Sequence, residues 1–139
     1  MDEPIKINEK ELMDYYGYKG TFGNFRMKSK FLRSWILHTL AYSSPHSGFT
    51  AKMQRSRGVN IGENCHFSPY VLLDLVYPHL VKIGDNVLIG SNNLISHNTV
   101  IENNCFLTSN ITLGGHITIG ANSFVGLSAT INQRVKIGK

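Results

Sequence analysis

An aliphatic residue returns at every sixth position between residues 83 and 139 of this 139-residue chain. The ten positions are Ile83, Ile89, Ile95, Ile101, Leu107, Leu113, Ile119, Val125, Ile131 and Ile137. Neither the 3.6-residue period of a helix nor the two-residue period of a simple strand produces this spacing. A fixed short period is typical of proteins built from stacked repeats. The pattern therefore predicts a solenoid.

Two further positions of each hexapeptide are patterned. The fifth residue is small or β-branched, as at Val87, Thr99 and Cys105. The fourth is often asparagine: Asn86, Asn92, Asn98, Asn104, Asn110 and Asn122. Asparagine tolerates the left-handed backbone region better than most residues, so it suits a repeated tight corner. Each hexapeptide is therefore predicted to form a short strand and a corner, with its first and fifth side chains pointing inward.

The order aliphatic, glycine, two variable residues, small, variable resembles the hexapeptide repeat of left-handed parallel β-helix acyltransferases. The resemblance covers residues 58–139 and implies an all-β solenoid in which three hexapeptides make one triangular coil. It implies a left-handed parallel β-helix of about four 18-residue coils, preceded by an N-terminal helical segment. We accordingly expect two parts, a helical and basic segment at residues 1–57 and the β-helix at 58–139.

The N-terminal segment has helical patterns. We expect helices at residues 4–18 and 25–42, and a linker at 43–48. Residues 50–57 form a short helix or lead directly into the first coil. The apolar positions of 25–42 follow helical spacing, which favours a helix that caps the open end of the solenoid. The alternative is peripheral contact of this basic, aromatic helix with an anionic membrane surface.

The positive charge lies mostly outside the repeat. Residues 1–57 hold ten Lys and Arg against five Asp and Glu, whereas residues 58–139 hold four of each. No nucleic-acid motif is present, so we expect no nucleic-acid partner. The polar start lacks the apolar core of a signal peptide, and no run has the length of a membrane span. Cys65 and Cys105 are interpreted as reduced core residues. We expect a cytoplasmic protein, with the inner membrane surface as an alternative location.

One irregularity interrupts the repeat. An aliphatic residue is expected at position 79, but His79 stands there and the register resumes at Ile83. Four extra residues are therefore inserted around 75–79. In a triangular coil, residues eighteen apart share a corner, which places this insertion on the corner of His97, Gly115 and Gln133. This corner is the candidate site.

The residues at this corner suit acyl transfer. His97 can accept a proton near neutral pH from an attacking hydroxyl or amine. Gly115, one coil further, offers a backbone N–H that can stabilise the oxyanion of a thioester under attack. No nucleophilic side chain is needed if the acceptor attacks directly.

Two stretches of the sequence resemble particular groups of acetyltransferases within this family. Residues 95–120 are similar to sialic-acid O-acetyltransferases and bacillosamine N-acetyltransferases, which implies His97 as the general base and Gly115 as the contact of the acetyl carbonyl. Residues 73–86 resemble sugar and capsule O-acetyltransferases of the maltose and galactoside group. The resemblance implies acetyl-CoA as the donor and a homotrimer with sites between protomers. The acceptor is then a sugar or a nucleotide- or lipid-linked sugar, as in polysaccharide biosynthesis.

The other site residues follow from this corner. The family often has a carboxylate after the histidine, but this chain has Asn98, which can fix a tautomer without supplying charge. Asp74 is our hypothesis for the missing carboxylate. We assign Gln133 and Ala129 to donor binding.

The acceptor side is assigned to three further residues, Tyr77, His79 and His116. His116 stands where asparagine usually does, so it is alternatively only a left-handed corner residue.

Two other functions remain open. The same fold could carry a metal hydratase resembling the γ-class carbonic anhydrases, with zinc held across a trimer by histidines. The available histidines are His66, His79, His97 and His116. The second is a non-catalytic trimeric scaffold. The leading hypothesis needs no metal.

Overall fold

A computed structural model describes residues 4–138, and the first three residues and Lys139 lie outside it. The chain divides into two compact units between Trp35 and Ile36. Three helices precede the strands: α1 (Pro4–Tyr15), α2 (Gly23–Ser43) and α3 (Ser47–Ser56). They confirm the helices expected at 4–18 and 25–42. Residues 50–56 are helical as well, in a helix that begins inside the expected linker and ends one residue before Arg57.

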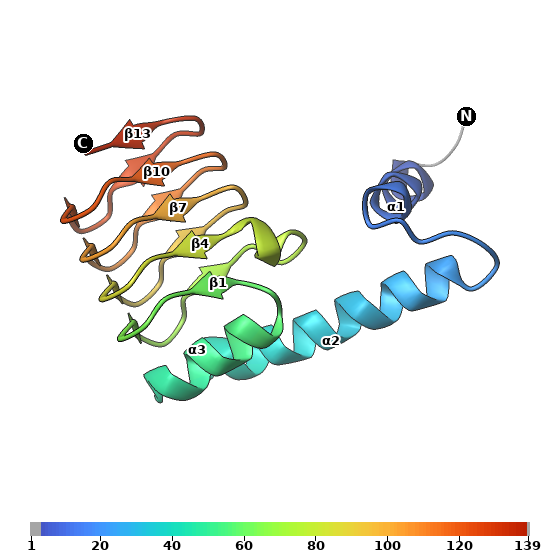
Figure 1. Cartoon of the computed structure of the whole chain (residues 1–139), viewed down its shortest axis with the longest axis horizontal. Helices are drawn as coiled ribbons and strands as arrows, with labels where there is room; N and C mark the ends of the chain where they lie inside the picture. The colour runs from blue at the N-terminus through green and yellow to red at the C-terminus, as the bar shows by residue number, and fades with distance from the viewer. Residues whose placement is uncertain (1–3, 139) are drawn as a thin grey trace. The chain divides into compact units, whose positions relative to one another are not determined.

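Two-residue strands follow α3 in parallel, coil upon coil (Figure 1). They form three parallel sheets with the orders β1-β4-β7-β10-β13, β11-β8-β5-β2 and β12-β9-β6-β3. The strands are β1 (Asn60–Ile61), β2 (His66–Phe67), β3 (Leu72–Leu73), β4 (Lys82–Ile83), β5 (Leu88–Ile89), β6 (Leu94–Ile95), β7 (Val100–Ile101), β8 (Phe106–Leu107), β9 (Thr112–Leu113), β10 (Thr118–Ile119), β11 (Phe124–Val125), β12 (Thr130–Ile131) and β13 (Lys136–Ile137). Every third strand pairs, which confirms the predicted left-handed β-helix of about four coils.

The strand register confirms the insertion. Lys82 pairs with Val100, eighteen residues later, whereas Asn60 pairs with Lys82, four residues further along than the repeat requires. The extra chain lies between β3 and β4 and contains the short 3-10 helix η1 (Pro78–Leu80). Because the surplus forms a loop outside the coil, the sheets on either side keep their alignment.

The interior of the coils is built from the first and fifth positions, as predicted. First-position residues such as Ile89, Ile95 and Leu113 are completely buried. At the fifth position, Asn93 is buried but satisfied, since its Nδ2 donates to the Thr108 carbonyl (2.6 Å) and its Oδ1 accepts the Ile111 N–H (2.7 Å). The core is thus apolar apart from a few polar side chains. Of these, Asn93 is paired, whereas the buried Thr99 Oγ1 has no hydrogen-bond partner among the described residues.

The two cysteines are also inward-facing. Cys65 and Cys105 are both free thiols. Their Sγ atoms contact the carbonyls of Gly84 (3.0 Å) and Gly120 (3.2 Å). Burial raises the pKa of both thiols. They are therefore small core residues, as interpreted from the sequence.

The corners use the left-handed backbone conformation at the fourth hexapeptide position. Non-glycine residues with positive φ are Asn64, Tyr70, Asn86, Asn92, Asn98, Asn104, Asn110, His116, Asn122, Ser128 and Arg134. At one corner the asparagine side chains also bond to one another. Asn64 donates to Asn86, Asn86 to Asn104 and Asn104 to Asn122, at 3.1–3.3 Å. This amide ladder ties successive coils together along one edge.

The first coil is covered by α3. Ala51 and Gln54 of α3 are buried, and the helix packs against β1 and β2. The end of α2 also takes part, because the Tyr42 carbonyl accepts the Tyr70 N–H (2.7 Å). The sequence assigned the capping role to residues 25–42. In the structure it falls to α3 and the last residues of α2, since α3 carries the side chains that fit against the first coil.

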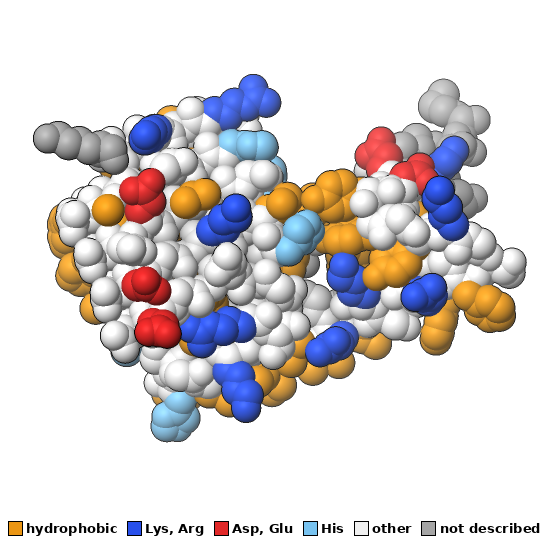
Figure 2. Space-filling view, in the orientation of Figure 1, with side chains coloured by type: hydrophobic (Ala, Val, Ile, Leu, Met, Phe, Trp, Pro, Cys, Tyr) orange, Lys and Arg blue, Asp and Glu red, His pale blue; other side chains and the backbone are white. Residues whose placement is uncertain are grey.

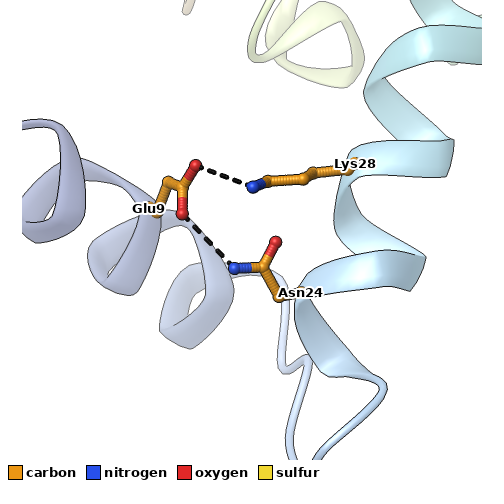
Figure 3. A network of polar contacts seen from close by, with 3 residues as sticks. All are labelled: Glu9, Asn24 and Lys28. Carbon is orange, nitrogen blue, oxygen red and sulfur yellow. Dashed lines mark hydrogen bonds and ion pairs between the residues drawn. The ribbon is translucent and has the colours of Figure 1, made fainter.

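Within the first unit, α1 packs on the beginning of α2. Glu9 accepts from Lys28 (3.1 Å) and from Asn24 (3.3 Å), as Figure 3 shows. The rings of Tyr16 and Phe31 meet edge to face at 5.8 Å. Among the described residues, no helix has the length and apolar character needed to cross a membrane.

Candidate functional site

The candidate corner follows the sheet that contains β3, β6, β9 and β12. The insertion follows β3, His97 follows β6, Gly115 follows β9 and Gln133 follows β12. These strands are neighbours in the order β12-β9-β6-β3. Residues that are 18 or more positions apart in the chain are therefore stacked along one edge at successive strand spacings, about 4.8 Å each.

His97 is oriented by its neighbour Asn98. The imidazole Nδ1 lies 2.8 Å from Asn98 Oδ1. Because an amide oxygen can only accept, Nδ1 carries the proton and Nε2 is the acceptor nitrogen of the neutral ring. Asn98 is also left-handed, with φ of 57°. It is therefore a corner residue and a tautomer-fixing residue at once.

The imidazole lies against Gly115. A β-carbon on Gly115 would come within 2.9 Å of His97 Cε1 and 3.1 Å of Nε2. The Gly115 carbonyl accepts the Arg134 N–H (3.0 Å), which fixes the peptide. Only glycine leaves room here for the ring in its observed position.

The backbone N–H of Gly115 differs from its neighbours on this corner. The His97 N–H donates to Asp74 Oδ2 (3.0 Å), and the Gln133 N–H donates to Asn132 Oδ1 (2.8 Å). Gly115 lies on the coil between those of His97 and Gln133. Its N–H has no acceptor within residues 4–138. The peptide N–H beside the His97 ring is thus unpaired among the described residues.

Asp74 lies at the site but holds the backbone. Its Oδ1 accepts the N–H groups of Val76 (2.9 Å) and Tyr77 (2.7 Å), while Oδ2 accepts the His97 N–H. The sequence-based hypothesis is that this carboxylate supports the imidazole. The structure differs, because both oxygens are occupied by the N–H groups that open the insertion and fix the His97 backbone.

Two rings contact His97, and a third ring contacts one of these two. The His116 ring meets it edge-on with centroids 5.4 Å apart, and the Tyr77 ring does so at 5.9 Å. His79 lies next to Tyr77 at 6.4 Å. His116 has φ of 61°, so it is a corner residue that also faces the candidate site. His79 and His116 are exposed, and Tyr77 is half-buried.

The two residues assigned to donor binding behave differently. Gln133 is exposed at the corner, one coil beyond Gly115. Ala129 is not brought to this corner, because fifth-position side chains point inward. It packs against the core, and its carbonyl accepts the Thr112 N–H (2.9 Å).

A buried polar group behind the site was missed by sequence reasoning. Arg57 follows α3, is 7% exposed, and donates through Nη2 to the Asp74 carbonyl (2.8 Å). Its Nη1 donates to Gln54 Oε1 (2.6 Å) and to His38 Nδ1 (3.2 Å). In the sequence Arg57 looks like its exposed neighbour Arg55, and only the packing of α3 distinguishes them.

This environment shifts two pKa values. Burial, together with the charge of Arg57, lowers the pKa of His38 to about 4. Burial lowers the pKa of Arg57 to about 10, and the Asp74 charge opposes this shift. At neutral pH His38 is therefore a neutral acceptor and Arg57 a charged donor.

A zinc site needs several ligand side chains that converge on one point. Within the described part of the chain, no group of three or more His, Cys, Asp and Glu side chains is arranged to hold a metal ion. The Tyr77 ring lies near both His97 and His79, with centroids 5.9 Å and 6.4 Å away.

Comparison with known proteins supports this fold. Residues 80–114 match the model described as the hexapeptide repeat of succinyl-transferase. No curated protein sequence matches the chain significantly. A solved structure, the hexapeptide-repeat-containing acetyltransferase of Vibrio cholerae O1 biovar eltor complexed with acetyl coenzyme A, is similar with a TM-score of 0.57 and 18% identity. The match covers 81% of this chain and 80% of the Vibrio chain, and at this identity it concerns the fold. Together the matched repeat and the structural likeness support the hexapeptide-repeat β-helix fold of this chain.

Proposed function

We propose that this protein transfers an acetyl or other short acyl group from CoA to a hydroxyl or amine of a sugar or glycan precursor. The observation that carries the proposal is the pairing of His97 and Gly115. The acceptor nitrogen of an oriented imidazole lies beside a peptide N–H that no group of the described chain uses. A base next to an oxyanion donor is the arrangement that acyl transfer needs.

The chemistry follows from these two groups. The acceptor oxygen or nitrogen attacks the thioester carbonyl carbon while His97 Nε2 removes its proton. The Gly115 N–H donates to the carbonyl oxygen as negative charge develops there. The C–S bond then breaks, the CoA sulfur leaves as a thiolate, and the imidazolium returns the proton to it. Asn98 keeps the ring in the required tautomer throughout.

The surroundings suit a sugar acceptor. Tyr77, His79 and His116 offer ring faces and polar edges around His97. Rings with a polar tip can contact the apolar face of a sugar and its hydroxyls together. We assign the acceptor to this side and the CoA chain to the side of Gln133.

The comparisons support the donor class. The Vibrio neighbour is an acetyltransferase complexed with acetyl coenzyme A, and the matching repeat is named for a succinyl-transferase. Both names refer to acyl transfer, and acetyl-CoA is accordingly the donor that we propose to test first.

We also propose that the protein is a homotrimer. The outer face of one sheet carries Leu88, Phe106 and Phe124 at paired positions of β5, β8 and β11. Their side chains are 37%, 42% and 66% exposed, and the two phenyl rings meet edge to face at 5.4 Å. An apolar stripe of this kind is typical of a surface covered by a partner. Sedimentation of wild type and Phe106→Lys tests the trimer, which the charged residue should disrupt.

A peripheral membrane contact is proposed for α2. Phe25, Leu32 and Trp35 are 72%, 57% and 58% exposed, and Arg26 and Arg33 lie on the same helix. Hydrophobic side chains follow the lower edge of α2 in Figure 2, with Lys and Arg side chains close by. Exposed aromatic residues flanked by basic ones favour an anionic membrane surface.

The test of the catalytic proposal measures donor binding and acyl transfer separately. Acetyl-CoA is titrated calorimetrically into wild type, and free thiol release is followed with a panel of hexoses, amino sugars and nucleotide sugars. His97→Asn should retain binding and lose at least about 100-fold in kcat. His66→Asn, on the exposed outer face of β2, is the matched control and should equal wild type. A folded wild type that neither binds acetyl-CoA nor releases thiol contradicts the proposal. In that case bound zinc would favour the metal hydratase, and its absence would favour the non-catalytic scaffold.

A further inference from the structure

The buried side chain of Arg57 connects the helical cap to the candidate site. Its guanidinium is held from one side by His38 of α2 and Gln54 of α3. On the other side, Nη2 reaches the carbonyl of Asp74 at 2.8 Å. A planar guanidinium has N–H donors in several fixed directions and can make all three hydrogen bonds together. The ammonium group of a lysine cannot reproduce this geometry.

Asp74 transmits this constraint. It follows β3 and begins the insertion, and its own N–H donates to the Ile95 carbonyl (3.0 Å). Its carboxylate accepts the His97 N–H. The carbonyl, amide and carboxylate of Asp74 are thus all hydrogen-bonded. The donor to the carbonyl, Arg57, is the one partner that lies outside the β-helix coils. If the Asp74 carbonyl were displaced, the carboxylate of the same residue, which accepts the His97 N–H, would move with it.

His97 has little tolerance for such movement. Its ring contacts the rings of Tyr77 and His116 and lies against Gly115. A misplacement of about 1 Å in a catalytic group can cost as much as 100-fold in rate.

We infer that Arg57 is a positioning residue for His97, acting through Asp74, and that α3 thereby sets the geometry of the site as well as covering the first coil. This inference rests on the proposed acyl transfer for its kinetic consequence. The positioning itself can be measured without activity.

The chain offers a matched control two residues earlier on α3. Arg55 likewise ties α3 to backbone carbonyls of the first coil, those of Ile61 (3.1 Å) and Gly62. Those carbonyls belong to a different corner. Arg55→Met therefore removes a comparable link between α3 and the solenoid without touching the candidate site.

The experiment compares Arg57→Lys, Arg57→Met and Arg55→Met with wild type. Steady-state kinetics give kcat and KM for acetyl-CoA. Hydrogen exchange of the His97 amide, followed with ¹⁵N-histidine, reports the bond to Asp74. We expect both Arg57 variants to lower kcat about 10-fold or more with KM changed less than about twofold. Exchange at His97 should accelerate by about 10-fold or more.

The control separates positioning from stability. Arg55→Met should lower the melting temperature while kcat and His97 exchange stay at wild-type values. The inference is overturned if the Arg57 variants change kcat and His97 exchange no more than Arg55→Met does. If Arg57→Met does not fold, Arg57→Lys decides. If wild type transfers no acyl group, the proposed function fails, and the exchange rates still confirm or reject the positioning role.

Discussion

The imidazole of His97 lies so close to Gly115 that a β-carbon on the glycine would be 2.9 Å from Cε1 and 3.1 Å from Nε2. Gly115→Ala therefore forces the ring away from its position beside the peptide N–H. We expect kcat to fall by roughly 10- to 100-fold with the fold retained. Thiol release from acetyl-CoA and a melting curve measure the two effects.

Gly126→Ala is the matched control, because a β-carbon there meets only Phe124 Cε1 at 3.9 Å. It should keep wild-type activity. Equal activity of Gly115→Ala and wild type would show that the ring has room to adjust and that its contact with Gly115 is not needed.

Asn98 has two roles that substitutions can separate. Asn98→Gly keeps the left-handed backbone but removes the acceptor of His97 Nδ1, whereas Asn98→Ala removes both. We expect the two variants to lose activity to a similar extent. Asn98→Ala should also be less stable, by about 1 kcal/mol, because a left-handed conformation is unfavourable for alanine. Urea unfolding beside kinetics checks this, and full activity of Asn98→Gly would rule out the tautomer role.

Asp74→Asn tests the role of the Asp74 carboxylate, which accepts hydrogen bonds from three backbone N–H groups. An amide can accept on only one side, so its NH₂ group would face a backbone donor. We expect a loss of about 1–3 kcal/mol in unfolding free energy. A lower kcat should accompany it, since the His97 backbone loses its acceptor. Unfolding curves and kinetics of Asp74→Asn and wild type are compared, and unchanged values in both would contradict this account.

The pH dependence of stability should depend on His38. Its pKa is about 4 in the folded protein, below the ordinary value of 6.5. Between these values the unfolded chain binds a proton that the folded chain does not, so stability falls as pH is lowered from 6.5 to 4 and His38 adds no further change below that. The expected loss is about 2–3 kcal/mol. His38→Asn keeps an acceptor for Arg57 without titrating. Urea unfolding at pH 7 and 4.5 should show a smaller loss for this variant, and an equal loss would exclude His38 as the source.

The proposed membrane contact can be followed with Trp35, since the chain has one tryptophan. Vesicles rich in phosphatidylserine should shift its fluorescence to the blue, and phosphatidylcholine vesicles should not, because the helix is flanked by basic residues. Leu32→Ser should weaken the shift. Leu94→Ser, on the outer face of β6, should leave it unchanged. No shift with anionic vesicles would exclude membrane contact by this helix.

Sequence and structure agree on the solenoid because its repeat is local. Each hexapeptide carries its own inward aliphatic residue and its own corner residue, and identical units can stack only in register. The insertion was equally visible, since His79 breaks a strict period and Ile83 restores it. The stacking of His97 on Gly115 followed from counting eighteen residues per coil.

The hydrogen-bonding roles of the residues within the corner are visible only in the tertiary structure. The sequence predicts that Asp74 lies on the corner of His97, and in the structure its carboxylate bonds the His97 backbone rather than the ring. Ala129 was assigned to the donor and packs inward. Counting along a repeat gives the corner of a residue, but the direction of a particular hydrogen bond depends on the loop conformation around it.

The sequence by itself determined the β-helix, its register and the corner that carries His97, because hydrophobic burial with a fixed period leaves one arrangement for the inward side chains. Only the tertiary structure decided what surrounds that corner. The packing of α3 on the first coil buries Arg57 and brings its guanidinium to the carbonyl of Asp74. Contacts between an aperiodic segment and a periodic one have no signature in either pattern, since they depend on how the two surfaces meet in space.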